Sequence, residues 1–157
     1  DCAGNTVYSS STSIPVSALN GLGNGDVLSG QTAYSLSTTF VGDLQSGVQM
    51  VGFNGNLANQ GLLFGFTVDG AGSPIGGATV SCGGCGPTFY LDDDPADGLL
   101  GSGGQANVST HPASGAFLIP GGPIDAYSAN DQGAHDWTEQ LNGSNPGSAT
   151  VATFVGN

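Results

Sequence analysis

Residues 62–68 read LLFGFTV, a run in which large apolar side chains occupy every second position. Successive side chains of a β-strand point to opposite faces of a sheet, so this spacing predicts a strand with one apolar face. Gly65 lies inside the run and predicts either a bulge or a close approach of another group to the strand. The residues that follow, DGAGSPIGG at 69–77, are of the types that end strands and make turns.

Short alternating runs of this kind recur along the chain, and its 29 glycines and 8 prolines leave no long uninterrupted window for a helix. Such runs between turns are typical of an antiparallel sandwich. The sequence therefore predicts an all-β fold, an antiparallel Ig-like or transthyretin-like β-sandwich. Besides residues 62–68, the predicted strands are Thr32–Val41, Val48–Phe53, Ala78–Cys82, Thr88–Leu91, Ala106–Thr110, Ala116–Ile119 and Ala149–Val155.

The alternation is most regular in Thr32–Val41, and residues 31–157 are predicted to form a single sandwich domain. Residues 1–30 are predicted to form an N-terminal arm. Within the arm, Ile14–Leu19 alternates as a strand does, but Pro15 lacks an N–H and restricts this segment to a sheet edge or a free arm. Because the first residue is not methionine, we expect a mature form from which a signal segment has been removed.

Two stretches carry a resemblance to a known family: FTVDGAGSPIGGATVSC at residues 66–82 and STHPASGAFLIPGG at 109–122. Over about residues 62–155 the chain resembles the carboxypeptidase regulatory-like, transthyretin-like β-sandwich domain. The shared pattern is a Gly-Pro turn before a GA-x-V strand, and a small-Gly-x-Phe turn into a later strand. The chain departs from the family in an insertion at 83–104 and in lacking charge at the family's polar positions. The resemblance implies an accessory or structural domain with no catalytic residue.

The chain contains no lysine or arginine, and its twelve Asp and Glu side chains give a formal net charge of −12. Nucleic acids and anionic lipids are bound through cationic side chains, so both are excluded as partners. No run of about 18 apolar residues is present, so we expect no membrane insertion. The lack of trypsin-type cleavage sites suits an extracellular or cell-surface protein, although adaptation to an acidic habitat explains the composition equally well.

The densest charge lies in LDDDPADG at residues 91–98, which contains Asp92, Asp93, Asp94 and Asp97. These carboxylates repel one another, and the chain has no basic side chain to relieve the repulsion. Ca²⁺ would relieve it, because this ion binds several carboxylate oxygens in flexible loops. The spacing lacks the distal Glu of an EF-hand, so the sequence leaves open a Ca²⁺ site and a solvated acidic loop.

Three cysteines, Cys2, Cys82 and Cys85, predict at least one disulfide in an oxidising compartment. Cys82–Cys85 would close a small ring, whereas Cys2 with either one would staple the arm to the sandwich. The longer loop restricts the unfolded chain more, so the sequence favours the staple, with the remaining cysteine free or intermolecular. A redox-active dithiol and a zinc site are weaker interpretations, since neither basic neighbours nor four well-spaced ligands are evident.

Two sequons, at Asn107 and Asn142, make these residues candidate glycosylation sites. Both glycans would lie on an extracellular, largely uncharged surface.

We hypothesise that the chain is a secreted, pilus-like structural subunit of an extracellular filament or surface coat, with itself as partner. An arm that alternates like a strand can complete the sheet of a neighbouring copy, because strand addition satisfies backbone groups along an exposed edge. The residues predicted to plug into the neighbour are Val7, Ile14, Val16 and Leu19. We expect no enzymatic activity.

Two alternatives remain open at this stage. A carbohydrate-binding or adhesive module would use aromatic rings as stacking platforms, and the candidates are Tyr34, Tyr90, Tyr127 and Trp137. An acid-active hydrolase would use paired carboxylates, for instance Asp136 with Glu139 or Asp125. The neighbouring pair His135 and Asp136 is interpreted as a surface feature beside a tryptophan packing anchor, since adjacent strand residues point to opposite faces.

Overall fold

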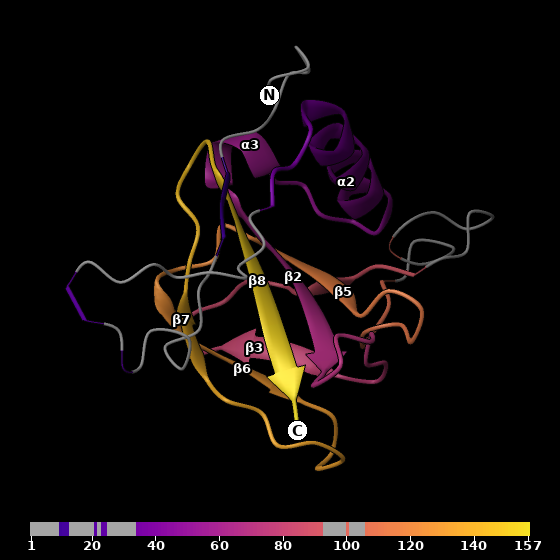
Figure 1. Ribbon diagram of the computed structural model, residues 1–157. Helices are drawn as coiled ribbons and strands as arrows, with labels where there is room; N and C mark the ends of the chain where they lie inside the picture. The colour runs from indigo at the N-terminus through magenta and orange to yellow at the C-terminus, as the bar shows by residue number, and fades with distance from the viewer. Residues whose placement is uncertain (1–9, 13–20, 22, 25–33, 93–99, 101–105) are drawn as a thin grey trace.

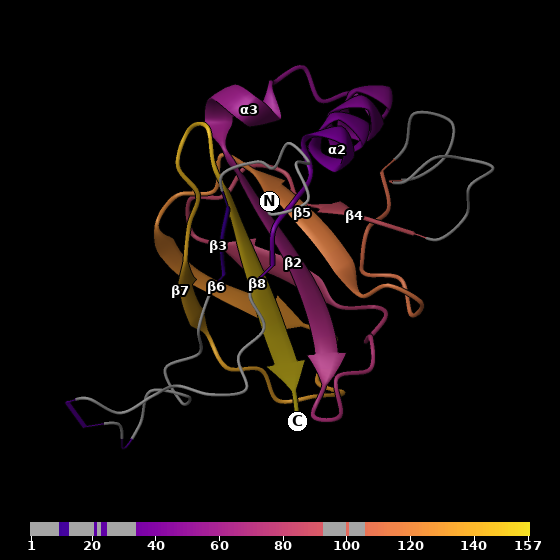
Figure 2. The ribbon, with the colours of Figure 1, turned by 45° about the horizontal axis from the view of Figure 1, so that its top comes forward.

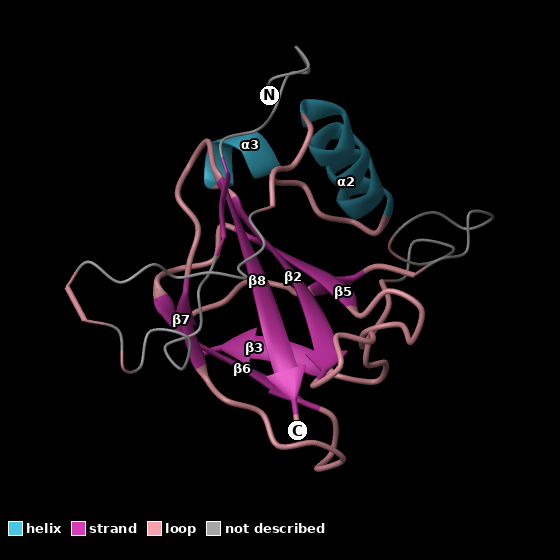
Figure 3. Cartoon of the chain, in the orientation of Figure 1, coloured by secondary structure: helices cyan, strands magenta, loops and turns pink. Residues whose placement is uncertain are grey.

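The computed structural model describes residues 10–12, 21, 23–24, 34–92, 100 and 106–157 of the chain. In this described part of the chain, two β-sheets and two helices are stacked in three layers (Figure 1). The helices lie against one face of the larger sheet, and the smaller sheet lies against its other face (Figure 2). The predicted all-β sandwich is confirmed, since strands dominate the described chain (Figure 3).

The larger sheet has five strands in the order β1-β8-β2-β5-β4. Their bounds are Ser10–Thr12 for β1, Leu62–Asp69 for β2, Phe89–Tyr90 for β4, Ala116–Pro120 for β5 and Ala149–Gly156 for β8. At the centre, β2 and β8 run parallel from the pair Leu62–Ala149 to the pair Asp69–Gly156. β5 and β4 continue the sheet with antiparallel pairing, and β1 adds to the outer side of β8 in parallel.

The smaller sheet has three antiparallel strands in the order β3-β6-β7. Their bounds are Thr79–Cys82 for β3, Asp125–Asn130 for β6 and Gln140–Asn142 for β7. The runs predicted at 78–82, 88–91, 116–119 and 149–155 are confirmed as β3, β4, β5 and β8. β6 and β7 were not predicted, because their sequences mix charged, polar and small residues with little apolar alternation.

β2 is buried on both faces over its first residues, which differs from the prediction of one apolar face. Leu62 and Phe64 pack in the core layer under the helices, whereas Leu63 packs in the layer between the two sheets. The two layers explain why every residue in LLFGF is apolar or glycine. Gly65 allows a close approach and marks no bulge: pairing with β5 is continuous here, and a Cβ at this position would lie 2.3 Å from Cζ of Phe117.

The strand predicted at Thr32–Val41 is wrong for the residues that the structure describes, because helix α2 spans Thr38–Met50. Ser37 caps the start of the helix, and its hydroxyl accepts a hydrogen bond from the Phe40 backbone N–H at 3.1 Å. This side-chain bond satisfies one of the free N–H groups of the first turn, and serine is among the residues preferred for it. The alternation up to Phe40 was therefore coincidental.

Beyond the cap, apolar residues follow a helical period, and Val41, Leu44 and Val48 are all buried against the larger sheet. The strand predicted at Val48–Phe53 is also wrong, because these residues form the end of α2 and the turn after it. A second, short helix, α3, spans Leu57–Gln60. Residues 106–110 form no strand either. In this segment side chains, in place of a ladder of backbone groups, make hydrogen bonds to the backbone at β4 and just before β3.

Candidate functional site

The sheet edges are the feature of this fold that bears most directly on the predicted strand addition. The outer edge of β3 faces away from β6, and Val80 at its centre is 2% exposed. The Val80 backbone N–H donates to the Tyr90 hydroxyl at 2.9 Å, and the Thr88 hydroxyl donates to the Val80 carbonyl at 2.9 Å. Side-chain hydroxyl groups thus replace the strand that would otherwise pair with this edge.

A threonine performs the same role two residues earlier, at Ala78. The Ala78 backbone N–H donates to the hydroxyl of Thr110 at 3.0 Å, while the Thr110 N–H donates to the Ala78 carbonyl at 2.8 Å. The Thr110 hydroxyl also donates to the Ile75 carbonyl at 2.9 Å, and the residue is 3% exposed. The outer side of β3 is therefore satisfied by Tyr90 of β4 and by Thr88 just before it, and Ala78, just before β3, is satisfied by Thr110 from the loop before β5.

Amide side chains protect the edges of the larger sheet. At β4, Nδ2 of Asn107 donates to the Tyr90 carbonyl at 3.1 Å. At β8, Nε2 of Gln140 donates to the Thr153 carbonyl at 2.7 Å. Proteins commonly discourage edge-to-edge pairing with lysine. This chain has no lysine, and at these edges side-chain hydroxyl and amide groups form hydrogen bonds with the backbone N–H and C=O groups instead.

The first part of the β8 edge is covered by backbone. β1 pairs with it in parallel, with Ser10 opposite Ala149 and Thr12 opposite Val151. The Thr12 hydroxyl accepts a hydrogen bond from the Tyr34 N–H at 2.9 Å. In the single chain the arm therefore completes its own sheet at these residues, and its donation to a neighbouring copy stays a prediction.

The predicted plug residues Val7, Ile14, Val16 and Leu19 lie outside the described residues, on either side of β1.

Asp131 is the centre of a polar cluster that the sequence did not predict. Oδ2 of Asp131 lies 2.5 Å from Nδ1 of His135, and Oδ1 accepts hydrogen bonds from the His135 backbone N–H and from Nε1 of Trp137, both at 3.1 Å. The Asp131 side chain is 5% exposed and that of His135 is 33% exposed. Burial raises the pKa of Asp131, but the hydrogen bonds from His135 and Trp137 outweigh burial and lower it from 3.8 to about 2.

The sequence analysis paired His135 with its neighbour Asp136, and the structure pairs it with Asp131 instead. The intervening residues Gln132 and Gly133 both have positive φ, so the chain turns back and brings the two side chains together. The pair of Asp131 with His135 closes the loop that ends beside Asp136. Asp136 in turn exchanges two backbone hydrogen bonds with Asn157, at 2.9 and 3.1 Å, so the loop is joined to the C-terminal end of β8.

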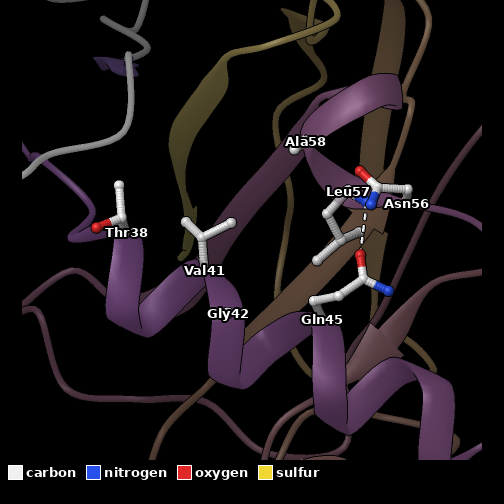
Figure 4. A pocket seen from close by; sticks show the side chains of 7 residues that line it. All are labelled: Thr38, Val41, Gly42, Gln45, Asn56, Leu57 and Ala58. Carbon is white, nitrogen blue, oxygen red and sulfur yellow. Dashed lines mark hydrogen bonds between the residues drawn. The ribbon is translucent and has the colours of Figure 1, made fainter.

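A pocket of about 300 Å³ lies between α2 and α3 (Figure 4). Gln45 reaches across it, accepting from the Leu57 N–H at 2.7 Å and donating to the Gly55 carbonyl at 3.0 Å. The pocket is at the small end of the range for ligand sites, and none of its lining side chains is ionisable. Its polar contacts serve to join the two helices.

Of the predicted Ca²⁺ ligands, only Asp92 is described. Its Oδ2 accepts a hydrogen bond from Nδ2 of Asn107 at 2.7 Å. Asp93, Asp94 and Asp97 lie outside the described residues. Within the described part of the chain no group of three or more metal-binding side chains gathers.

The predicted staple from Cys2 to the sandwich is wrong, because Cys82 and Cys85 form a disulfide with each other. The two residues are only three apart, at the end of β3, and the glycines between them let the chain turn tightly. The short distance along the chain therefore decides which cysteines pair, whereas the prediction considered only how much a longer loop restricts the unfolded chain. Cys2 lies outside the described residues.

The two sequon asparagines are both engaged in the fold. Nδ2 of Asn107, the atom that a glycan would modify, donates to Tyr90 and Asp92. Asn142 is 5% exposed, and its Oδ1 is buried with no hydrogen-bond partner among the described residues. A glycan would have to displace the hydrogen bonds of Asn107, and at Asn142 it would have to bring a buried side chain to the surface.

The aromatic side chains do not share one exposed platform. Tyr90 is 5% exposed and Tyr127 is fully buried between the sheets, where burial and the nearby Asp125 raise its pKa to about 12. Tyr34 is 40% exposed, and Trp137 is half-buried against the core between the sheets. The predicted carbohydrate platform therefore loses two of its four rings to the core.

No family model, no curated protein and no solved structure matches this chain. In the described residues, none of the helices has the length and apolar character needed to cross a membrane.

Proposed function

We propose that the chain is a structural subunit of an extracellular filament or surface coat, and that copies join by strand addition through the N-terminal arm. The observation that carries the proposal is β1, in which Ser10–Thr12 adds to the edge of β8. This contact uses backbone hydrogen bonds that do not depend on which copy supplies the strand. The Cys82–Cys85 disulfide and the resemblance to accessory sandwich domains support an extracellular structural role.

The arm is long enough to reach a neighbour. Residues 13–33 separate β1 from the body of the fold. Fully extended, a segment of this length spans roughly 70 Å, whereas a domain of this size has a radius of gyration of about 15 Å. The strand can therefore pair with its own chain or with an adjacent copy, which is the condition for exchange between subunits.

Charge sets the conditions for assembly. Each copy carries a formal net charge of −12 at neutral pH, and like charges oppose association. The sequence pI is about 4.1, so acid removes this repulsion. Divalent cations would also reduce it, and we propose that Ca²⁺ binds the acidic segment 92–97. Assembly should therefore increase toward pH 4, and at neutral pH it should require a divalent cation and be reversed by a chelator.

Deletion of residues 1–19 tests the proposal. The truncated protein should remain folded, because the described core residues lie between positions 36 and 154, but it should stay monomeric. Size-exclusion chromatography and negative-stain electron microscopy at pH 4 and pH 7 report assembly, and circular dichroism reports folding. The full-length chain is the control. Filaments formed by the folded, truncated protein would refute the arm mechanism.

A further inference from the structure

We infer that the acceptor site for the arm is the outer edge of β8 at Ala149–Val151, and that it binds Ser10–Thr12 of a second copy in parallel. This inference rests on the proposed function, since it requires that arms are exchanged between copies. It adds the partner strand, its direction and its register. The register expected between copies is the one that β1 adopts within the chain.

The pairing with β2 shows which groups of β8 face outward. The Leu62 N–H donates to the Ser148 carbonyl, while Leu62 stands opposite Ala149 in the register. In a parallel pair, the backbone polar groups of successive residues point alternately to one side and the other. Even-numbered residues of β8 therefore bond to β2, and odd-numbered residues direct their N–H and C=O groups to the outer edge.

Only the first part of this edge is open to a strand. Further along, the Thr153 carbonyl is already occupied by the side chain of Gln140, and Asn157 exchanges backbone bonds with Asp136. An incoming strand that continued past Val151 would have to break these contacts. The short pairing of Ser10–Thr12 with Ala149–Val151 matches the length of edge that remains.

Two other described edges are poor acceptors. The outer side of β3 is bonded to the hydroxyl groups of Tyr90 and Thr88, Ala78 just before it is bonded to Thr110, and the outer side of β4 is bonded to the amide of Asn107. Pairing a strand there would expel side chains that are already hydrogen-bonded. At the edge of β8, a strand from a second copy would replace the chain's own β1, and the same backbone pairing would form again.

The acceptor also offers a polar contact to the arm. The Tyr34 N–H donates to the Thr12 hydroxyl. In an exchanged assembly, Tyr34 of the receiving copy would donate to Thr12 of the donor.

Cysteine cross-linking between two differently marked copies tests the acceptor site. One copy carries Ser11→Cys and the other, labelled with heavy isotopes, carries Thr150→Cys, because positions 11 and 150 are opposite in the register. Both copies carry Cys2→Ser. Neither can form the 11–150 bond within one chain, so a disulfide that joins a light and a heavy peptide reports exchange.

The control replaces Thr150→Cys with Val108→Cys, at a side chain that is 83% exposed and lies outside the strands. After co-assembly and mild oxidation, we expect the 11–150 cross-link in roughly tenfold or greater excess over the 11–108 cross-link, because pairing raises the local concentration of the two thiols. The pair Thr12→Cys with Val151→Cys repeats the measurement on the opposite face of the strands, should Thr150→Cys impair folding.

The outcomes separate the two proposals. Filaments whose 11–150 and 12–151 cross-links do not exceed the control would place the acceptor elsewhere and overturn this inference, while leaving assembly through the arm intact. A full-length chain that stays monomeric at pH 4 and with Ca²⁺ would overturn both.

Discussion

Replacing Tyr90 by phenylalanine removes a single hydroxyl from the buried junction between the two sheets. Tyr90 is 5% exposed, and its hydroxyl accepts the Val80 N–H at 2.9 Å. The same hydroxyl is hydrogen-bonded to Thr88, whose own hydroxyl donates to the Val80 carbonyl, so three groups form a closed network. Tyr90→Phe keeps the ring and opens no cavity, but it leaves a buried backbone N–H without an acceptor.

An unsatisfied buried donor destabilises a protein by about 1–3 kcal/mol. A loss of about 2 kcal/mol changes the unfolding equilibrium constant roughly 30-fold and lowers the Tm of a domain of this size by about 4–8 °C. Urea denaturation of the full-length protein, followed by fluorescence of the single tryptophan, measures the free energy of unfolding.

Tyr34→Phe is the matched control, because Tyr34 is 40% exposed, and we expect it to change stability by no more than about 0.5 kcal/mol. Thr88→Val, alone and combined with Tyr90→Phe, completes a double-mutant cycle. The two substitutions should couple by about 0.5–3 kcal/mol, since they act on one network. The reasoning is refuted if Tyr90→Phe destabilises no more than the control and its effect simply adds to that of Thr88→Val.

Three further predictions concern stability. Folding lowers the pKa of the Asp131 carboxyl from 3.8 to about 2, so its stabilising contribution is complete above about pH 4 and disappears as the pH falls toward 2. Asp131→Asn should abolish this component of acid unfolding. An acid transition that is unchanged in the variant would contradict the role of the cluster. Gly65→Ala should destabilise the protein by about 1–3 kcal/mol, because the new methyl group meets a buried ring. Gly42→Ala, on the exposed side of α2, should stabilise the protein by about 0.5–1 kcal/mol. Thermal melts in which both substitutions shift the Tm in the same direction would count against the packing described. Reduction of the disulfide between Cys82 and Cys85 should lower the free energy of unfolding by up to about 2 kcal/mol without unfolding the chain. Urea denaturation of the Cys2→Ser variant, with and without a reductant, measures this loss. Complete loss of structure would show that the bond does more than close a small loop.

Five of the eight predicted strands could be located from sequence because their alternation and their bounding turns are local properties of the chain. The stretch LLFGFTV at residues 62–68 was assigned correctly to a strand. The sequence did not reveal that this strand is buried on both faces, because a helical layer and a second sheet approach it from opposite sides. Thr32–Val41 shows the limit of the pattern, because a few alternating residues can also precede and begin a helix. Here the cap at Ser37 starts α2.

The candidate assembly site could be predicted in part. Composition excluded ion pairs with lysine or arginine, and the strand-like alternation of Ile14–Leu19 suggested an arm in residues 1–30. The acceptor edge, the parallel direction of β1 and the hydroxyl and amide groups that protect the other edges depend on which distant segments become neighbours. The pair of Asp131 with His135 depends likewise on a turn with positive φ at two successive residues.

By itself, the sequence determined a surface without lysine or arginine, a chain built of strands and turns, and the capacity to form a disulfide, because each follows from residue type and short-range spacing. Tertiary structure decided which edge of the sheet the arm completes, which cysteines are joined and which carboxylate binds the histidine. The physical reason is that hydrogen bonds and packing contacts act only over a few ångströms. Residues far apart in the chain interact in this way only after the fold has brought them together.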